Sequence, residues 1–489
     1  MQMKMKVVFN KDSGTKALAL GGVAVALLQV ACGSQDPTDP APASTYQFES
    51  RFQPGESSVS YTGQIYRHAL IEDLTGRIAG LTARIDDGTL TPTTGAVVAE
   101  LDYFLSFDGQ LAGNQAIGIS GPLAIEPGTY RDLSSSKDLV GKLAGNDPKG
   151  QHRDWSTDFV GWNEGGVTTP ESLVRWYFAQ IEALAIDRAS GRNVMGPGGE
   201  AVSSVSVDAQ GRDYRQLVQK FLGVAVAFSQ GADDYLDDDT DGKGLRLDNT
   251  KADGDKPYSA LEHQWDEGFG YFGAARNFGD YTDDEIAGKG GRPDWQGHHD
   301  TNGDGRLQLV SECNFGHSVN AAKRDRGSAD SAKTDYTQQA FDAFLAGRSL
   351  IAGADGALSA AQTAELAMHR DRALDAWERA IAATVVHYVN DTLQDMAKFG
   401  TPDYDFESHA KHWSELKGFA LGLQFNRRSP VSAADFAQFH ELVGTAPALP
   451  GAPSVDAYKT ALLQARKLLR DAYGFDPANM GDDAGQGGW

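Results

Sequence analysis

Hydrophobic residues recur at spacings of three and four along most of this chain, and such spacing places them on one face of an α-helix. The pattern is clear between residues 63 and 85. It is longest between residues 359 and 398, where Ser359 and Gln362 resemble a helix-capping box. Only residues 202–212 alternate in the manner of a strand. The chain is therefore expected to be all-α, with helices over residues 63–85, 91–107, 169–184, 213–236, 258–273, 336–352, 359–398, 411–426, 432–443 and 455–473.

Two of the expected helices echo each other in sequence. YSALEHQWDEGFGYFG at residues 258–273 and KHWSELKGFALGLQFN at residues 411–426 both contain Trp-x-Glu. In each, a histidine lies just before the tryptophan and a Gly-Phe pair follows shortly after the glutamate. We interpret the echo as the mark of a multi-helix bundle of two related halves. The two segments are expected to meet at one buried site.

Long acidic, Gly-rich loops connect the expected helices, and residues 108–168 are expected to be largely irregular. With 489 residues the chain can bury a large core. We expect one helical domain over residues 49–475. A tail of small and polar residues follows at 476–489, and we expect it to be disordered.

The N-terminus has the pattern of an export signal. A basic stretch is followed by a short apolar run that ends in Val30-Ala31-Cys32. Residues 1–31 are therefore predicted to be a lipoprotein signal peptide, and Cys32 the lipidated residue. Residues 32–48 are proline-rich and would form a disordered tether. We expect anchoring to the outer membrane by lipid alone, with the domain facing the periplasm or the cell surface.

Charge and cysteine content narrow the function further. The formal net charge of −23 argues against nucleic acid as a partner, because no basic patch is present to neutralise phosphates. The chain has two cysteines, too few for a disulfide framework or a cysteine-rich metal site.

Two acidic loops resemble calcium-binding loops, in which oxygens at alternate positions surround the cation and a glycine allows the sharp turn. The first spans residues 237–248, and the second spans residues 300–312 with its final glutamate one place late. A solvated acidic loop is the alternative for both. The candidate calcium ligands are Asp237, Asp239, Asp241 and Asp248 in the first loop, and Asp300, Asn302, Asp304 and Glu312 in the second.

The echoed helices also carry candidate ligands for iron or zinc. His263 and Glu267 are four residues apart and share a helix face, and His412 with Glu415 offers a second pair. Glu and His from facing helices of a bundle can hold such metals. Alternatively, these side chains hydrogen-bond one another, as buried polar groups do. The residues expected to surround and orient the ligands are Glu262, Asp266 and His387.

Several segments together resemble a bacterial lipoprotein family called domain of unknown function 4856. They are SVSYTGQIYRHALIEDL (58–74), EHQWDEGFGYFG (262–273), ECNFGHSVNAAKRD (312–325), ATVVHYVNDTL (383–393) and HWSELKGFALGLQFN (412–426). The resemblance spans residues 58–445, nearly the whole chain after the predicted signal.

The family is distantly similar to the imelysins, which are helical, exported, two-repeat proteins implicated in iron acquisition. The resemblance implies that the segments with His263, Asp266, Glu267, His387, Trp413 and Glu415 are signature positions. Imelysins carry G-x-H-x-x-E. This chain has Leu261 and Asp266 at two positions of that motif around His263, and Ala410 in place of the glycine before His412.

Three functions are compatible with these features. The first is a lipid-anchored, periplasm-facing binding protein that assists metal (iron) acquisition through the His/Glu site. Its partners would be a metal ion or iron-bearing ligand and an outer-membrane uptake protein. The second is a metal-dependent hydrolase with Glu267 or Glu415 as general base. The third is a structural or interaction lipoprotein with calcium-stapled loops.

Overall fold

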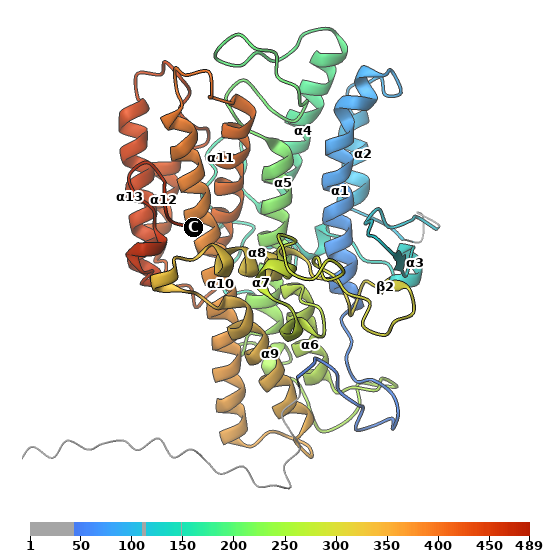
Figure 1. Ribbon diagram of the computed structural model, residues 1–489. Coiled ribbons are helices and arrows are strands. Elements are labelled where there is room, and N and C mark those ends of the chain that lie inside the picture. Colours follow the sequence, from blue (N-terminus) through green and yellow to red (C-terminus); the bar gives the residue numbers. More distant parts are fainter. Residues whose placement is uncertain (1–43, 110–113, 148) are drawn as a thin grey trace, which may run out of the picture. The chain divides into compact units, whose positions relative to one another are not determined.

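The computed structural model describes residues 44–109, 114–147 and 149–489. The predicted signal peptide (1–31) and Cys32 lie outside the described residues, as does most of the predicted tether. Within the described ranges the chain forms α-helices joined by loops, with two strands of three residues each (Figure 1). The predicted all-α, multi-helix bundle is confirmed.

Thirteen α-helices and two strands are present in the described ranges. The helices are α1 (Thr62–Asp86), α2 (Ala96–Leu105), α3 (Tyr130–Leu133), α4 (Pro170–Ala189), α5 (Tyr214–Leu222), α6 (Ala260–Phe272), α7 (Asp283–Ile286), α8 (Gly316–Gly327), α9 (Tyr336–Ala352), α10 (Ala360–Ala397), α11 (Phe406–Ala420), α12 (Ala433–Val443) and α13 (Val455–Tyr473). The strands β1 (Ala124–Glu126) and β2 (Arg306–Gln308) pair in parallel.

Between α5 and α6 the backbone winds as a π-helix in two segments, η2 (Gly223–Phe228) and η3 (Gly231–Tyr235). A π-helix holds more residues per turn than an α-helix and usually occurs as a single turn. The sequence pattern predicted one continuous helix over residues 213–236. The structure keeps that stretch helical but changes its winding.

Two helix starts follow the capping chemistry of the sequence. The Ser359 hydroxyl accepts a hydrogen bond from the Gln362 backbone N–H, and the Gln362 side-chain oxygen accepts one from the Ser359 backbone N–H, so α10 begins where the capping box predicted. Thr169 caps α4 in the same way through Ser172, with Pro170 as the first helical residue.

The 38-residue helix α10 is the longest element and packs against α8, α9, α11 and α13. In Figure 1 its N-terminal half lies beside α9, and its C-terminal half continues into the group formed by α11, α12 and α13. The helices α1, α2, α4 and α5 lie next to that group, to its right in this view. One helix therefore joins the two parts of the bundle.

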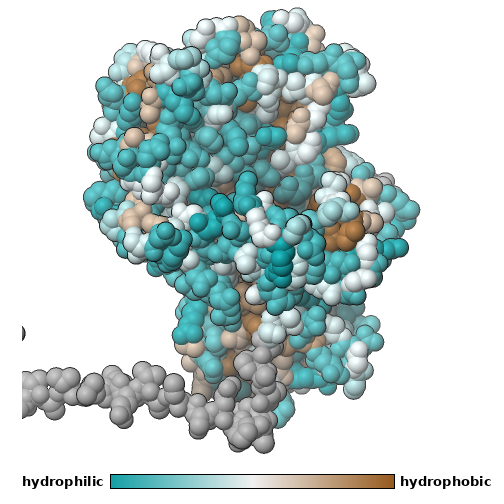
Figure 2. All heavy atoms as spheres, viewed as in Figure 1, coloured by the Kyte–Doolittle hydropathy of each residue, from teal (hydrophilic) through white to brown (hydrophobic). Residues whose placement is uncertain are grey.

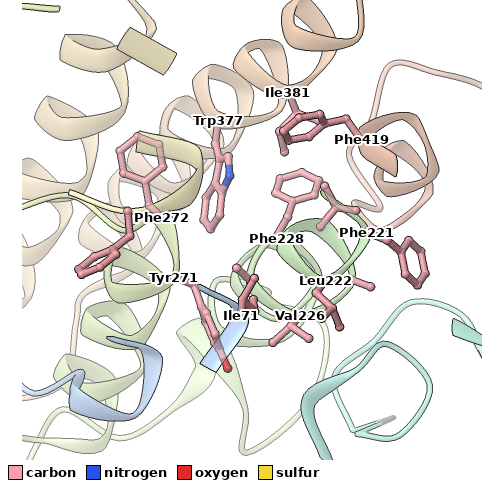
Figure 3. Packing of buried hydrophobic residues seen from close by; sticks show 14 of the residues in the cluster. Ile71, Phe221, Leu222, Val226, Phe228, Tyr271, Phe272, Trp377, Ile381 and Phe419 are labelled. Carbon is pink, nitrogen blue, oxygen red and sulfur yellow. The ribbon is translucent and has the colours of Figure 1, made fainter. Parts of the chain in front are cut away.

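The core is aromatic where α10 meets the π-helical segment. The Trp377 ring lies 5.3 Å from the Phe228 ring and 5.4 Å from the Phe272 ring of α6, measured between ring centroids (Figure 3). Gly231 allows this approach, because a Cβ atom there would lie 2.7 Å from the Trp377 ring. The π-helical segment is thus packed directly against the longest helix.

A close helix–helix contact joins α6 to α1. A Cβ atom added at Gly270 would lie 2.7 Å from the Tyr61 Cβ atom and 3.0 Å from the Gln64 Cβ atom. Three residues earlier on α6, the Glu267 carboxylate accepts a hydrogen bond of 2.8 Å from Gln64 Nε2. Gly270 permits the close approach of α6 to α1, and the hydrogen bond between Gln64 and Glu267 holds the two helices together.

The same contact recurs between α11 and α5. A Cβ atom added at Gly418 would lie 2.7 Å from the Lys220 Cβ atom. Three residues earlier, the Glu415 carboxylate lies 3.3 Å from Lys220 Nζ. It also accepts from the Gln216 amide, once that amide is oriented with its nitrogen toward it. The sequence echo Trp-x-Glu-x-x-Gly therefore corresponds to one helix-pair contact made twice.

Residues 202–212, which alternate like a strand in sequence, take part only in the isolated bridge between Val207 and Asp213. One local prediction is corrected by the structure. Residues 476–489 were predicted to be disordered, but Trp489 is 5% exposed and its ring lies 4.9 Å from the Phe475 ring. The Trp489 ring and hydrogen bonds donated by Asn390, Gln394 and Arg466 hold this Gly-rich end.

The face shown in Figure 2 is covered mostly by hydrophilic residues, with small hydrophobic patches between them. This agrees with the acidic composition of the chain. Among the described residues, no helix combines the length and the apolar character needed to cross a bilayer.

The two glycine contacts can be tested by substitution. Gly270→Ala and Gly418→Ala are each expected to lower the free energy of unfolding by roughly 1–3 kcal/mol, because overpacking a close contact costs about that much. Guanidinium denaturation followed by circular dichroism measures the change. The matched control is Gly80→Ala on α1, where a Cβ atom meets nothing within 4 Å and helix propensity should add about 0.5–1 kcal/mol. Equal stability of Gly418→Ala and Gly80→Ala would show that α11 and α5 do not approach closely.

Candidate functional site

The α6 part of the predicted metal site faces the start of α1. Glu267 accepts hydrogen bonds from Gln64 and from Gln264, the latter at 3.1 Å. His263 Nδ1 lies 3.0 Å from the Ser60 carbonyl oxygen, and its Nε2 lies 3.8 Å from the Glu267 carboxylate. Both side chains therefore have partners within α6 and at the start of α1.

Glu262 and Asp266, predicted to orient metal ligands, instead share a buried ion pair with Arg348 of α9. Arg348 Nε lies 2.8 Å from Asp266 and Nη1 lies 3.1 Å from Glu262, and none of the three side chains is exposed. The Tyr46 hydroxyl donates to Asp266 at 2.8 Å. Burial raises the pKa of Asp266, and the Arg348 charge opposes that rise. These carboxylates lock α6 to α9 and to the segment before α1.

The α11 part of the predicted site has different neighbours. His412 Nδ1 lies 2.7 Å from Asp395 Oδ2, and His412 Nε2 lies 3.9 Å from Asp391 Oδ2. Burial lowers the pKa of His412, but the hydrogen bond and charge of Asp395 outweigh it and raise the pKa overall. Glu415 pairs with Lys220.

The four predicted ligands therefore form two groups, and the prediction of one shared site is wrong. Helix α6 lies against α1 and α9, whereas α11 lies against α5 and α10. Equivalent positions of two repeated helix pairs each face their own partner helix, so the echo does not bring them together. Within the described ranges, no three His, Cys, Asp or Glu side chains are arranged to hold a metal ion.

His387 lies beside the same carboxylate of α10 as His412. Its Nε2 lies 3.3 Å from Asp391 Oδ2. Burial and the nearby Arg324 charge lower the pKa of His387 to about 3. Burial also raises the pKa of Asp391. The structure thus gathers His387, His412 and Glu415 around carboxylates that the sequence analysis did not single out.

The first acidic loop does not gather its carboxylates as a calcium loop would. Asp237 lies 3.3 Å from Arg427 and 3.1 Å from Arg428, both in the segment after α11. Asp239 also pairs with Arg427. The two remaining predicted ligands turn elsewhere, with Asp241 2.7 Å from Arg246 and Asp248 accepting from Thr250. Arginine side chains therefore take the place that the prediction gave to a cation.

The second acidic loop keeps its predicted residues together. The Asp300 carboxylate accepts hydrogen bonds from the backbone of Gly303, Asp304 and Gly305, which hold its pKa below the usual value. Asn302 Nδ2 lies 3.0 Å from Asp304 Oδ2. Glu312 is buried and accepts from Thr301 and from the Gln308 backbone at 2.9 Å. The loop has a calcium-loop turn, and β2 follows it.

A cleft of about 760 Å³ lies between α1, α5, α8 and the segment at residues 114–120, with Phe419 of α11 at one side. Its volume is within the range of small-molecule sites in proteins. Polar and charged side chains contribute to its walls beside the aromatic rings of Phe104, Phe315 and Phe419. The polar lining residues that matter below are His68, Glu72, Lys220, His317, Asn320 and Lys323.

The cleft contains two lysines on different helices. Lys220 of α5 is held by Glu415 and donates to Gln219 at 2.8 Å. Lys323 of α8 donates no hydrogen bond and forms no ion pair within the described part of the chain. Burial and the charges of Lys220 and Arg324 lower the pKa of Lys323. The cleft therefore has one amine that the protein leaves uncompensated.

Glu72 of α1 is the acidic counterpart in the cleft. It forms no ion pair among the described residues, and its one hydrogen bond is from Gln219 at 3.5 Å. The surrounding atoms raise the pKa of Glu72, although the charge of Lys220 opposes this. Glu72 therefore offers the cleft a carboxyl group that takes up a proton more readily than usual.

Two buried histidines close the cleft. His317 is 2% exposed, and its Nδ1 has no hydrogen-bond partner among the described residues. Burial, reinforced by His68, lowers the pKa of His317 to about 3, and burial lowers that of His68 to about 4. Both rings are neutral near pH 7 and add no charge to the cleft.

Sequence reasoning missed Lys220, Glu72, Lys323 and Arg324. Each is a charged residue on a helix, and such residues usually face solvent. The one usable signal was the segment ECNFGHSVNAAKRD, which was recognised as a family segment but was not predicted to be a helix. Its few hydrophobic residues gave no stripe, and yet it forms α8, which walls the cleft.

The fold and cleft define the chain as an all-α bundle protein with a ligand-sized interhelical cleft. Residues 168–284 match the family model described as domain of unknown function (DUF4856). This segment contains α4, α5, the π-helical segments and α6. The family resemblance seen in the sequence is confirmed, while the distant relation to imelysins stays a prediction. No curated protein and no solved structure matches the chain.

The buried ion pair at Arg348 gives a second test of the structure. Arg348→Met is expected to lower the free energy of unfolding by about 3–5 kcal/mol at pH 7, because it leaves the buried Asp266 carboxylate without a cation and Glu262 with only Arg51, at 3.6 Å. The loss should be smaller at pH 4, where Asp266, whose pKa burial raises, takes up a proton. Arg192→Met removes an exposed pair with Asp187 and should cost no more than about 1 kcal/mol. Similar losses for the two variants would contradict the burial of Arg348.

Proposed function

We propose that this chain is an exported binding protein that holds a small ligand in the cleft between α1, α5 and α8. The observation that carries the proposal is the cleft itself, which combines a ligand-sized volume with two ionisable side chains, Glu72 and Lys323, that no ion pair neutralises within the described ranges. Convergent polar groups in an otherwise apolar hollow are the usual mark of a ligand site.

The cellular setting belongs to the same proposal. A lipid at Cys32 would anchor the domain to the outer membrane, where it faces the periplasm or the cell surface and passes its ligand to an uptake protein. Iron acquisition remains part of the proposal in one form. Because the predicted His and Glu ligands lie in two groups, the iron would arrive within a larger ligand rather than as a bare ion.

Calcium is proposed as a structural ion for the second acidic loop. Asp300, Asn302 and Asp304 already lie in one turn, and oxygen ligands at alternate positions suit this hard cation. The first loop is left out of this proposal, because Arg427 and Arg428 neutralise Asp237.

The binding function can be tested by filling the cleft. Gly76 of α1 lines the cleft, and a Cβ atom there meets nothing within 4 Å. Gly76→Phe should therefore occupy the cleft without distorting α1, and should weaken ligand binding by at least about tenfold, or 1.4 kcal/mol. A thermal-shift screen of small molecules on the full chain, followed by calorimetry of the hits, measures the effect.

Gly80→Phe is the matched control, because Gly80 lies one turn further along α1, meets nothing at its Cβ position and does not line the cleft. It should bind the hits as the unchanged protein does. If no compound binds, or if Gly76→Phe binds the hits as well as Gly80→Phe, the binding proposal fails. The structural lipoprotein with calcium-stapled loops would then be favoured.

Metal content separates the calcium and iron proposals. Protein purified without nickel chromatography and analysed by mass spectrometry should retain calcium, and Asp300→Asn should lose it, because a ligand carboxylate is removed. Asp241→Asn in the first loop is the control and should retain the same calcium. Stoichiometric iron or zinc in the unchanged protein that is lost in the double variant His263→Ala, His412→Ala would instead support the His/Glu metal site. Calcium retained by Asp300→Asn would overturn the assignment to the second loop.

A further inference from the structure

We infer that the cleft binds its ligand through an anionic group, a carboxylate or a phosphate, which lies against Lys323 of α8. This inference rests on the proposed binding function and names the chemistry of the ligand. Three observations on the same helix carry it, and each concerns a positive group that the protein itself leaves without a partner.

The first observation is the position of Lys323. Its side chain lines the cleft and is only partly exposed, yet within the described residues no carboxylate approaches its ammonium group to within 4 Å. Glu415 and Glu72 are acids whose charges act on it at longer range, and the Glu415 carboxylate is already paired with Lys220. An amine in a partly desolvated hollow is stabilised by a negative charge that enters with the ligand.

The second observation is Arg324, the next residue along α8. It is 7% exposed, and in the part of the chain that the structure describes it donates no hydrogen bond and forms no ion pair. Its Nε atom is fully buried without a partner. Burying an unpaired charge is costly. Burial lowers the pKa of Arg324 to about 10, a value at which the group is still charged near pH 7.

The acids nearest to Arg324 are already engaged. Asp391 lies beside His387 and His412, and Glu415 lies beside Lys220. Lys220 and Lys323 line the cleft and Arg324 follows Lys323 on α8, while the acids whose charges act on them already have other partners. A ligand anion at Lys323 would meet an ammonium group that no carboxylate pairs with in the described residues.

The third observation is the N-terminus of α8. Its first residue is Gly316, and no side chain caps the helix. The first helical residues also line the cleft, together with the unpartnered His317. Unpaired backbone N–H groups carry partial positive charge and favour anions. The whole α8 wall of the cleft is therefore positive, while Glu72 on the α1 wall discourages an anion on that side.

The test is a titration of the full chain with citrate, with inorganic phosphate and with uncharged sorbitol, by calorimetry at low ionic strength. We expect citrate, phosphate or both to bind and sorbitol not to bind. Citrate alone would identify a carboxylate ligand, phosphate alone a phosphate ligand. Lys323→Met should weaken anion binding at least about tenfold, whereas Lys323→Arg should retain most of it because the charge stays. Lys411→Met, at an exposed position of α11, should bind as the unchanged protein does.

Arg324 supplies an independent readout that does not depend on the binding assay. Because its charge is buried without a partner, Arg324→Met should raise the melting temperature in the absence of anions. Adding citrate or phosphate should then raise the melting temperature of the unchanged protein more than that of the variant. A lower melting temperature of Arg324→Met without anion would show that this arginine already has a partner and would overturn the inference.

The remaining outcomes separate this inference from the proposed function. Anion binding that is equal in the unchanged protein and in Lys323→Met overturns the inference. The inference also fails if no anion binds while uncharged compounds from the screen bind the unchanged protein but not Gly76→Phe. In that case the binding function stands. If Gly76→Phe weakens the binding of no compound, both the inference and the proposed binding function fail.

Discussion

The close contact of α6 with α1, and its repetition between α11 and α5, is the constraint on which the rest of the structure depends. At each contact a glycine removes the side chain that would hold the helices apart, and a glutamate one turn earlier binds the facing helix. These contacts fix the rotation of α5 and α11 about their axes. They thereby decide that Lys220 reaches both Glu415 and the cleft.

The second half of the bundle differs from the first in how it uses the same contact. At α6 the neighbouring carboxylates, Glu262 and Asp266, are neutralised by Arg348 and closed off from solvent. At α11 the corresponding region borders an open cleft, and Lys323 and Arg324 remain without partners in the described residues. The paired charges at α6 therefore stabilise the fold, whereas two charged side chains near α11 have no partner that could neutralise them in the described residues. This asymmetry is one reason why we place the binding function at the cleft between α1, α5 and α8.

Much of the fold could be predicted from the spacing of hydrophobic residues, and the caps at Ser359 and Thr169 gave two helix starts to the residue. Helix α8 was missed because its burial involves small residues such as Ala321 and Ala322, which leave no hydrophobic stripe. The order at Trp489 was missed because one aromatic residue cannot be recognised as an anchor without its pocket.

The candidate site was harder to predict than the fold. The echo marked His412 and Glu415, which lie beside charged side chains of α10 and α5, but it could not show whether two similar segments meet or only repeat a contact. Two repeated segments can have similar surroundings without lying near each other, so the repeat does not give the distance between them. Lys323 and Arg324 look like ordinary surface charges in the sequence, because only tertiary packing removes their partners.

The π-helical winding after α5 fixes the chain length of this region. Gly223 at its start lines the cleft, and Gly231 further on lies against the Trp377 ring. If the same residues wound as an α-helix, everything that follows would rotate by about 100° for each extra residue that a π turn accommodates. The glycine would leave the tryptophan, and a Cβ-bearing neighbour would meet it. The cavity and the aromatic core therefore depend on the same two wide helical segments, which keep Gly223 at the one and Gly231 at the other.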